Sequence, residues 1–128
     1  MTKEECLESY LPVFQAALNY WAALLKPAEV LTLLYINDRT LRYGKEWEHV
    51  KFSHYTKGLP AKSSAKVIHC GIGISQTTLQ RALKTLQEAD LIHAENTQQS
   101  GRYYMGNLYR VNILKVTLPL AHQRYPDA

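Results

Sequence analysis

The sequence predicts an α+β fold that is mostly helical, and three observations support it. A strongly amphipathic segment over residues 75–90 has helix periodicity and begins at a serine suited to cap it. Two segments of strand composition, 91–97 and 107–113, follow it with a glycine-containing turn between them. Two further helix-period segments come before it. A helix with an outward polar face followed by a hairpin is typical of a winged helix-turn-helix. We therefore expect a winged helix with a C-terminal β-hairpin wing and an extra N-terminal helix.

Length and composition restrict the class of protein. With 128 residues, 46% of them hydrophobic, the chain matches one globular domain of ordinary size. No stretch of about 18 uncharged apolar residues, the length of a membrane span, occurs. The start, MTKEECLESY, is acidic and polar, unlike a secretory signal. Cys6 and Cys70 lack the C-x-x-C spacing of a metal or redox motif. These features predict a cytoplasmic protein that contacts no membrane and holds neither a disulfide framework nor a cofactor.

Residues 1–25 are predicted to form the extra N-terminal helix, from about Glu4 to Leu25. Pro12 implies that this helix either begins there or bends there. Its wide apolar face, which includes Phe14, Tyr20 and Trp21, offers a seam for a homodimer or a face for another partner. Apolar residues recur in steps of three and four at Leu7, Leu11, Phe14, Leu18, Trp21 and Leu25.

Residues 26–114 are predicted to form the winged-helix domain. A helix should begin at Pro27 and continue to about Leu41, with Gly44 as a stop. A short strand over 47–53, a brief helix over 53–57 and a loop over 58–66 should follow, and the apolar run 67–70 is of uncertain type. Residues 115–128 are expected to be a tail with one apolar patch. The apolar stripe of the helix at Pro27 is expected at Val30, Leu31, Leu34 and Tyr35.

The segment GIGIS, residues 71–75, has two interpretations. It resembles a phosphate-binding loop, but position 76 is glutamine where a dinucleotide fingerprint needs glycine, and the Gly-Lys-Ser/Thr of a P-loop is absent. We favour a tight turn in which Gly71 and Gly73 deliver Ser75 as a helix cap, with Ile72 and Ile74 packing inward. The helix behind it should bury Leu79, Ala82, Leu83 and Leu86 and expose Gln76, Thr77, Gln80, Arg81, Lys84 and Gln87.

The exposed side chains of this helix suit the major groove of DNA. Glutamine pairs with adenine, arginine with guanine, and threonine offers a hydroxyl or a methyl group, so Gln76, Thr77, Gln80 and Arg81 are candidate base readers. An ordinary solvated helix face is the competing interpretation. At the expected wing tip one of the two tyrosines should fold back onto the core. Candidate contacts to the DNA backbone are Ser75, Thr78, Lys84, Arg102, Tyr103 and Tyr104.

The net charge of +4 and pI of about 9.1 are compatible with nucleic-acid binding. A basic apron along the backbone would need Arg39, Arg42, Lys45, Lys51, Lys57, Lys62 and Lys66 to cluster in space. The five histidines are scattered, His69-Cys70 alone cannot complete a tetrahedral metal site, and no carboxylate pair stands out. We therefore expect no enzyme, no catalytic residue and no metal site.

Two motifs resemble known families. GISQTTLQRALKTLQEADLI is similar to a pattern found in bacterial winged-helix DNA-binding proteins, and RYGKEWEHVKFSHYTKG followed by GIGIS resembles the N-terminal domain of the phage and plasmid replication protein O family. The resemblance spans residues 27–113. It implies a recognition helix carrying Ser75, Gln76, Thr77, Gln80, Arg81 and Lys84, and binding to repeated origin sites. The chain departs from that family by ending at Ala128, before any region that would recruit helicase machinery.

Together these features predict a protein that binds double-stranded DNA with sequence preference, in replication initiation or transcriptional regulation. The alternative is a non-catalytic adaptor or inhibitor that uses the same helix, or the N-terminal face, to bind a partner protein. The partner expected in that case is a replication or transcription protein.

Overall fold

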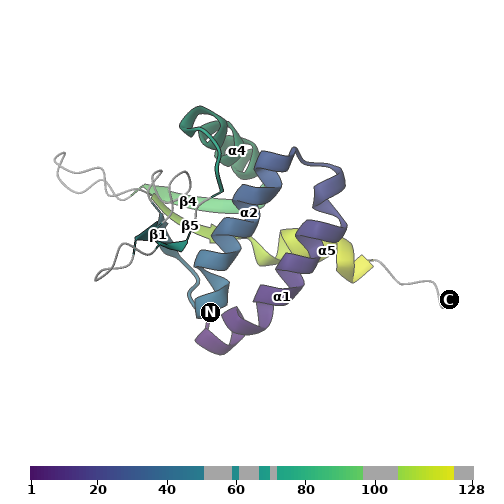
Figure 1. Cartoon of the computed structure of the whole chain (residues 1–128). Helices are drawn as coiled ribbons and strands as arrows, with labels where there is room; N and C mark the ends of the chain where they lie inside the picture. Colours follow the sequence, from purple (N-terminus) through teal and green to yellow (C-terminus); the bar gives the residue numbers. More distant parts are fainter. Residues whose placement is uncertain (51–58, 61–66, 70–71, 97–106, 123–128) are drawn as a thin grey trace.

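The computed structural model describes residues 1–50, 59–60, 67–69, 72–96 and 107–122 (Figure 1). Within these residues the fold is α+β and mostly helical, as the sequence predicts. The elements are α1 (Lys3–Asn19), η1 (Trp21–Ala23), α2 (Pro27–Arg39), η2 (Leu41–Tyr43), β1 (Glu48–Val50), β2 (Leu59–Pro60), β3 (Val67–His69), α4 (Gln76–Glu88), β4 (Ile92–Asn96), β5 (Asn107–Val111) and α5 (Ile113–His122).

Helix α1 begins with a capping box and continues through its proline. The Thr2 hydroxyl accepts a hydrogen bond from the backbone N–H of Glu5, whose carboxylate accepts one in return from the Thr2 N–H. Pro12 therefore neither starts nor ends the helix. The α-helix ends at Asn19 and gives way to η1, so the predicted end at Leu25 was wrong.

The buried face of α1 is not the face that carries its leucines. Its core contacts come from Cys6, Val13, Ala16 and Ala17, all at most 1% exposed. Small residues allow the axis of α1 to approach its neighbour closely. Leu7, Leu11 and Leu18 remain 44–56% exposed.

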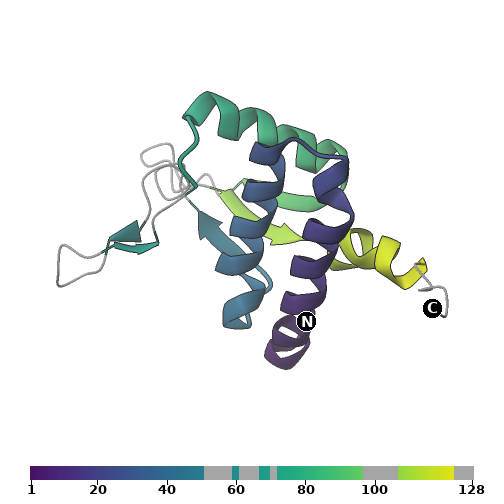
Figure 2. The ribbon, with the colours of Figure 1, turned by 45° about the vertical axis from the view of Figure 1, so that its right-hand side comes forward.

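Helix α2 occupies the middle of the molecule and packs against α1, α4 and β5 (Figure 2). It buries Leu33 and Ile36 completely, whereas Leu31 of the predicted stripe is 42% exposed. The helix ends at Arg39, and η2 then closes at Gly44, whose φ of 71° is left-handed. When α2 and η2 are taken together as one helical segment, the predicted end at Gly44 is confirmed.

Two antiparallel sheets follow. The larger has the strand order β1-β5-β4 and includes the hairpin predicted from the sequence, in which Ala94 lies opposite Tyr109. The predicted short strand near Trp47 is present as β1 and pairs with β5. Strands β2 and β3 form a second, two-stranded sheet. Leu59 and Pro60, expected in a loop, are therefore in a strand.

Helix α4 agrees closely with its prediction. Leu79, Ala82, Leu83 and Leu86 are at most 4% exposed, and Leu91 and Ile92 continue the core beyond the helix. Asp90 takes a left-handed φ of 61°, and the Leu91 N–H donates to the Leu86 carbonyl oxygen at 2.9 Å. This is the bonding pattern of a Schellman C-cap. It turns the chain directly from the helix into β4.

The expectation of a tail is wrong for residues 115–122, and residues 123–128 lie outside the described residues. Residues 113–122 form α5, which packs against α1 and buries Val116 (Figure 1). The Trp21 indole N–H donates a 2.9 Å hydrogen bond to the Val116 carbonyl oxygen. Trp21 therefore attaches η1 to α5, and its indole is not part of a free apolar seam.

One hydrophobic core unites α1, α2, α4, the larger sheet and α5. The brief helix expected over 53–57 lies outside the described residues. Among the helices that the structure describes, none is long and apolar enough to cross a membrane.

Candidate nucleic-acid interface

The outward face of α4 is polar along its whole length. Thr77, Arg81, Lys84 and Glu88 recur at helical spacing and form one exposed stripe opposite the buried leucines. Gln76, Gln80 and Gln87 form a second exposed stripe beside it. Each of the four predicted base readers is therefore exposed on α4. In both views α4 lies at one end of the fold, with its neighbours on its inner side (Figures 1 and 2).

The start of α4 is fixed by the turn predicted for residues 71–75. Gly73 has a φ of 67°, a conformation that favours glycine, while Gly71 lies outside the described residues. The Ser75 hydroxyl accepts a 3.2 Å hydrogen bond from the Thr78 N–H and donates to the Thr78 hydroxyl at 2.9 Å. Ile72 and Ile74 are partly buried against the core. The cap of α4 is thus satisfied, with both hydroxyls exposed at its N-terminal end.

A pocket of about 440 Å³ is lined by residues of α4 and of the start of α2. Arg81 and Lys84 of α4 line it together with Lys26, which precedes α2. Glu29 and Glu88 bring acidic groups to the same pocket, and the Lys84 ammonium lies 3.9 Å from the Glu88 carboxylate. Thr78, Ala82 and Thr85 complete the α4 side. The cationic side chains thus lie on the α2 side of the helix, and Gln76 and Gln80 lie away from it.

The basic apron is not formed by the residues that can be located. Arg39 is only 7% exposed and donates a 3.2 Å hydrogen bond to the Tyr35 hydroxyl, so it cannot contribute to an apron on the surface. Arg42 pairs with Asp38 at 2.7 Å, and Lys45 pairs with Glu48 at 2.9 Å. These pairs neutralise the positive charge locally. Lys51, Lys57, Lys62 and Lys66 lie outside the described residues.

The wing-tip residues Arg102, Tyr103 and Tyr104 also lie outside the described residues. The base of the hairpin is described, and its position is fixed by a polar network. Arg110 of β5 donates to the Glu46 carboxylate at 2.9 Å and, through Nε, to His93 Nδ1 at 2.9 Å. Since Nδ1 accepts, the other ring nitrogen of His93 donates to Asp90 at 2.8 Å.

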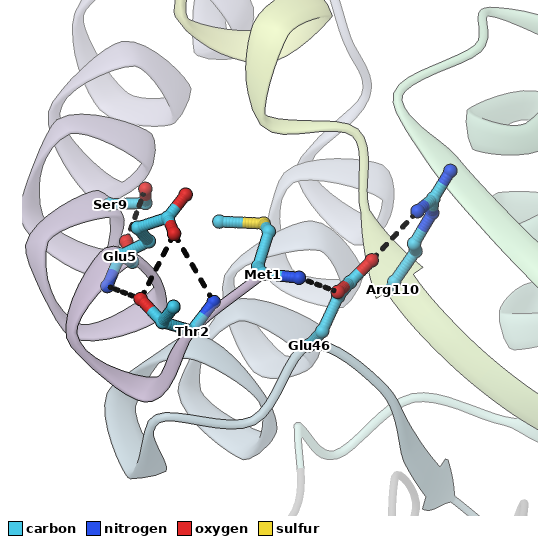
Figure 3. A network of polar contacts seen from close by, with 6 residues as sticks. All are labelled: Met1, Thr2, Glu5, Ser9, Glu46 and Arg110. Carbon is cyan, nitrogen blue, oxygen red and sulfur yellow. Dashed lines mark hydrogen bonds and ion pairs between the residues drawn. The ribbon is translucent and has the colours of Figure 1, made fainter.

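Glu46 joins this network to the N-terminus (Figure 3). Its second carboxylate oxygen accepts a 3.0 Å hydrogen bond from the Met1 amino group, while Arg110 approaches from β5. The hydrogen bond from the Met1 amino group, followed by that from Arg110, holds the pKa of Glu46 below its ordinary value against the opposing effect of burial. The Arg110 guanidinium also lies 4.9 Å from the centre of the Trp47 ring.

Sequence reasoning missed this network because its members are far apart in the chain. Glu46 and Arg110 are separated by 64 residues. The only local signal was the alternation of β5, which places Arg110 on the face opposite Tyr109 and Val111.

Among the described residues no cluster of His, Cys, Asp or Glu has the geometry to hold a metal ion. Comparison of the chain with protein-family models, curated proteins and solved structures found no match. The resemblance to the replication protein O family therefore stays a prediction from the motifs.

Proposed function

We propose that the protein is a winged-helix protein that binds double-stranded DNA with sequence preference through α4. The order of elements supports this assignment: a helix and a strand come before the capped helix α4, and a hairpin follows it. In a winged helix, the second helix of the helix-turn-helix inserts into the major groove. The observation that carries the proposal is the exposed polar face of α4, presented at one end of the fold on a helix whose opposite face is buried.

Each exposed side chain of α4 has a role in this proposal. Gln76, Thr77, Gln80 and Arg81 read base edges, because amide and guanidinium groups match the donor and acceptor pattern of the major groove. Lys84 and the hydroxyls of Ser75 and Thr78 contact phosphates at the start and flank of the helix. The positive end of the helix dipole at Ser75 also favours a phosphate there. Arg102, Tyr103 and Tyr104 would contact the flanking backbone from the wing.

The process is replication initiation or transcriptional regulation, and the resemblance of residues 27–113 to the replication protein O family supports replication only weakly, because many repressors share the motif of α4. Repeated binding sites in the selected DNA would support initiation at an origin.

Selection of bound sequences from a random duplex pool tests the proposal, followed by titration of the selected duplex at several salt concentrations. We expect a consensus sequence and an affinity that falls steeply as salt rises, because phosphate contacts release counterions. Absence of salt-dependent binding to any duplex would contradict the proposal. A protein partner whose affinity is unchanged by Arg81→Ala and Lys84→Ala would favour the adaptor instead.

A further inference from the structure

We propose that the exposed leucine stripe of α1 is a dimerisation surface, and that its partner is α1 of a second copy of this chain in antiparallel orientation. The stripe consists of Leu7, Leu11, Phe14 and Leu18. The three leucines are 44%, 56% and 47% exposed, and Phe14 is half-buried.

The spacing of the stripe is that of a coiled-coil seam. Its residues are separated by steps of four, three and four, the a and d positions of a heptad. The next two members of this series, Trp21 and Leu25, lie after the end of α1 and pack against the core. The exposed seam is therefore confined to α1 itself.

The seam is self-complementary in one orientation. When two copies of α1 run antiparallel about a twofold axis between Pro12 and Val13, Leu7 faces Leu18 of the second copy and Leu11 faces Phe14 of the second copy. A twofold interface requires this reciprocity, in which the same patch serves on both subunits. The twofold axis therefore relates two Leu7–Leu18 layers and two Leu11–Phe14 layers.

The charge of α1 also favours this orientation. Its first half is net acidic, because Glu4, Glu5 and Glu8 outnumber Lys3, and residues 9–19 contain no charged side chain. A parallel pair would bring the acidic halves of two copies together, whereas an antiparallel pair places each acidic half beside an uncharged one. The antiparallel arrangement also opposes the two helix dipoles.

The size of the seam predicts the strength of association. A helix of 17 residues is about 25 Å long, so its face alone gives an interface at the small end of specific complexes. We therefore expect a reversible dimer with a dissociation constant in the range of about 1–100 μM.

The test is sedimentation velocity of the full chain without DNA over that concentration range, so its outcome is independent of the proposed DNA binding. We expect a monomer–dimer equilibrium that Leu11→Glu abolishes. Leu24→Glu is the matched control, since Leu24 is 63% exposed but lies outside the seam, and it should dimerise like the unmodified chain. Circular dichroism should show that both variants are folded. A monomeric unmodified chain, or a dimer that persists in folded Leu11→Glu, would overturn the proposal.

Cysteine cross-linking determines the orientation. In a chain with its native cysteines replaced, Leu7→Cys and Leu18→Cys variants are mixed and oxidised. An antiparallel seam should give the mixed Leu7→Cys/Leu18→Cys disulfide in preference to either homodimer. Preferential Leu7→Cys homodimers would contradict the antiparallel arrangement.

Discussion

At the scale of single residues, Ser75 caps α4 and, in the proposed function, also contacts a phosphate, and substitution can separate these two roles. Ser75→Ala removes the acceptor for the Thr78 N–H and should lower the free energy of unfolding by about 1 kcal/mol, the usual cost of losing an N-cap. Ser75→Asp retains a good cap and should leave stability nearly unchanged, but its carboxylate would repel a phosphate at this position. Urea unfolding and duplex titration measure the two effects. Unchanged duplex affinity in Ser75→Asp would exclude a phosphate contact at Ser75.

Glu46 predicts how stability depends on pH. Its pKa in the folded protein lies below its ordinary value of 4.5 because of the Met1 and Arg110 hydrogen bonds. The unfolded chain therefore binds the proton more readily, and the stabilisation is present above the ordinary pKa and lost as pH falls through the folded value.

Urea unfolding at intervals below neutral pH should show this loss in the unmodified protein. Glu46→Gln should be less stable near neutral pH and should lose less stability on acidification. Parallel pH profiles for the two proteins would show that the network around Glu46 contributes no pH-dependent stability.

At the scale of elements, Gly44 is needed for the end of the second helical segment. Its φ of 71° is disfavoured for a residue with a Cβ, and an added Cβ would lie 2.5 Å from Lys3 Cγ. Gly44→Ala should therefore lower the free energy of unfolding by about 1–2 kcal/mol. In a Lys3→Ala background the steric contact is absent, so any remaining loss of stability measures backbone strain alone. Undiminished stability in both backgrounds would mean that the turn adopts another conformation without cost.

The helix α4 and the hairpin were predictable because their signals are local. The serine cap, the leucine period and the alternation of β5 lie within a few residues of the structures they specify. Helix α1 shows the limit of this reasoning, because hydrophobicity marks Leu7, Leu11 and Leu18 while close packing selects Ala16 and Ala17 for the core. Helix α5 was missed because Pro119 argues against a helix, and its packing against α1 depends on tertiary contacts.

In the candidate site too, local features could be predicted from the sequence and tertiary contacts could not. The exposed face of α4 follows from the position of its buried face, so Gln76, Thr77, Gln80 and Arg81 could be placed from the sequence. The surroundings of Arg39 and Arg110 could not, because one arginine is buried against Tyr35 and the other pairs with a residue distant in sequence. Whether a basic residue is free for DNA depends on such tertiary partners.

At the scale of the whole molecule, α2 and β4 pack against the inner side of α4, and the outer face of this helix is exposed. The central claim is that this face reads DNA bases. If it does, the loss of the Arg81 side chain and the loss of the Lys84 side chain should affect DNA binding differently, because Arg81 contacts base edges and Lys84 contacts phosphate.

The most direct test is competition titration of the selected duplex against a random duplex. For Arg81→Ala we expect a loss of about 1–3 kcal/mol for the selected duplex and a reduced preference for it. For Lys84→Ala we expect similar weakening for both duplexes and a smaller salt dependence. Gln87→Ala, an exposed change near the far end of α4, serves as the control. Equal preference for the two duplexes in the unmodified protein, or no effect of Arg81→Ala on that preference, would contradict base reading by α4.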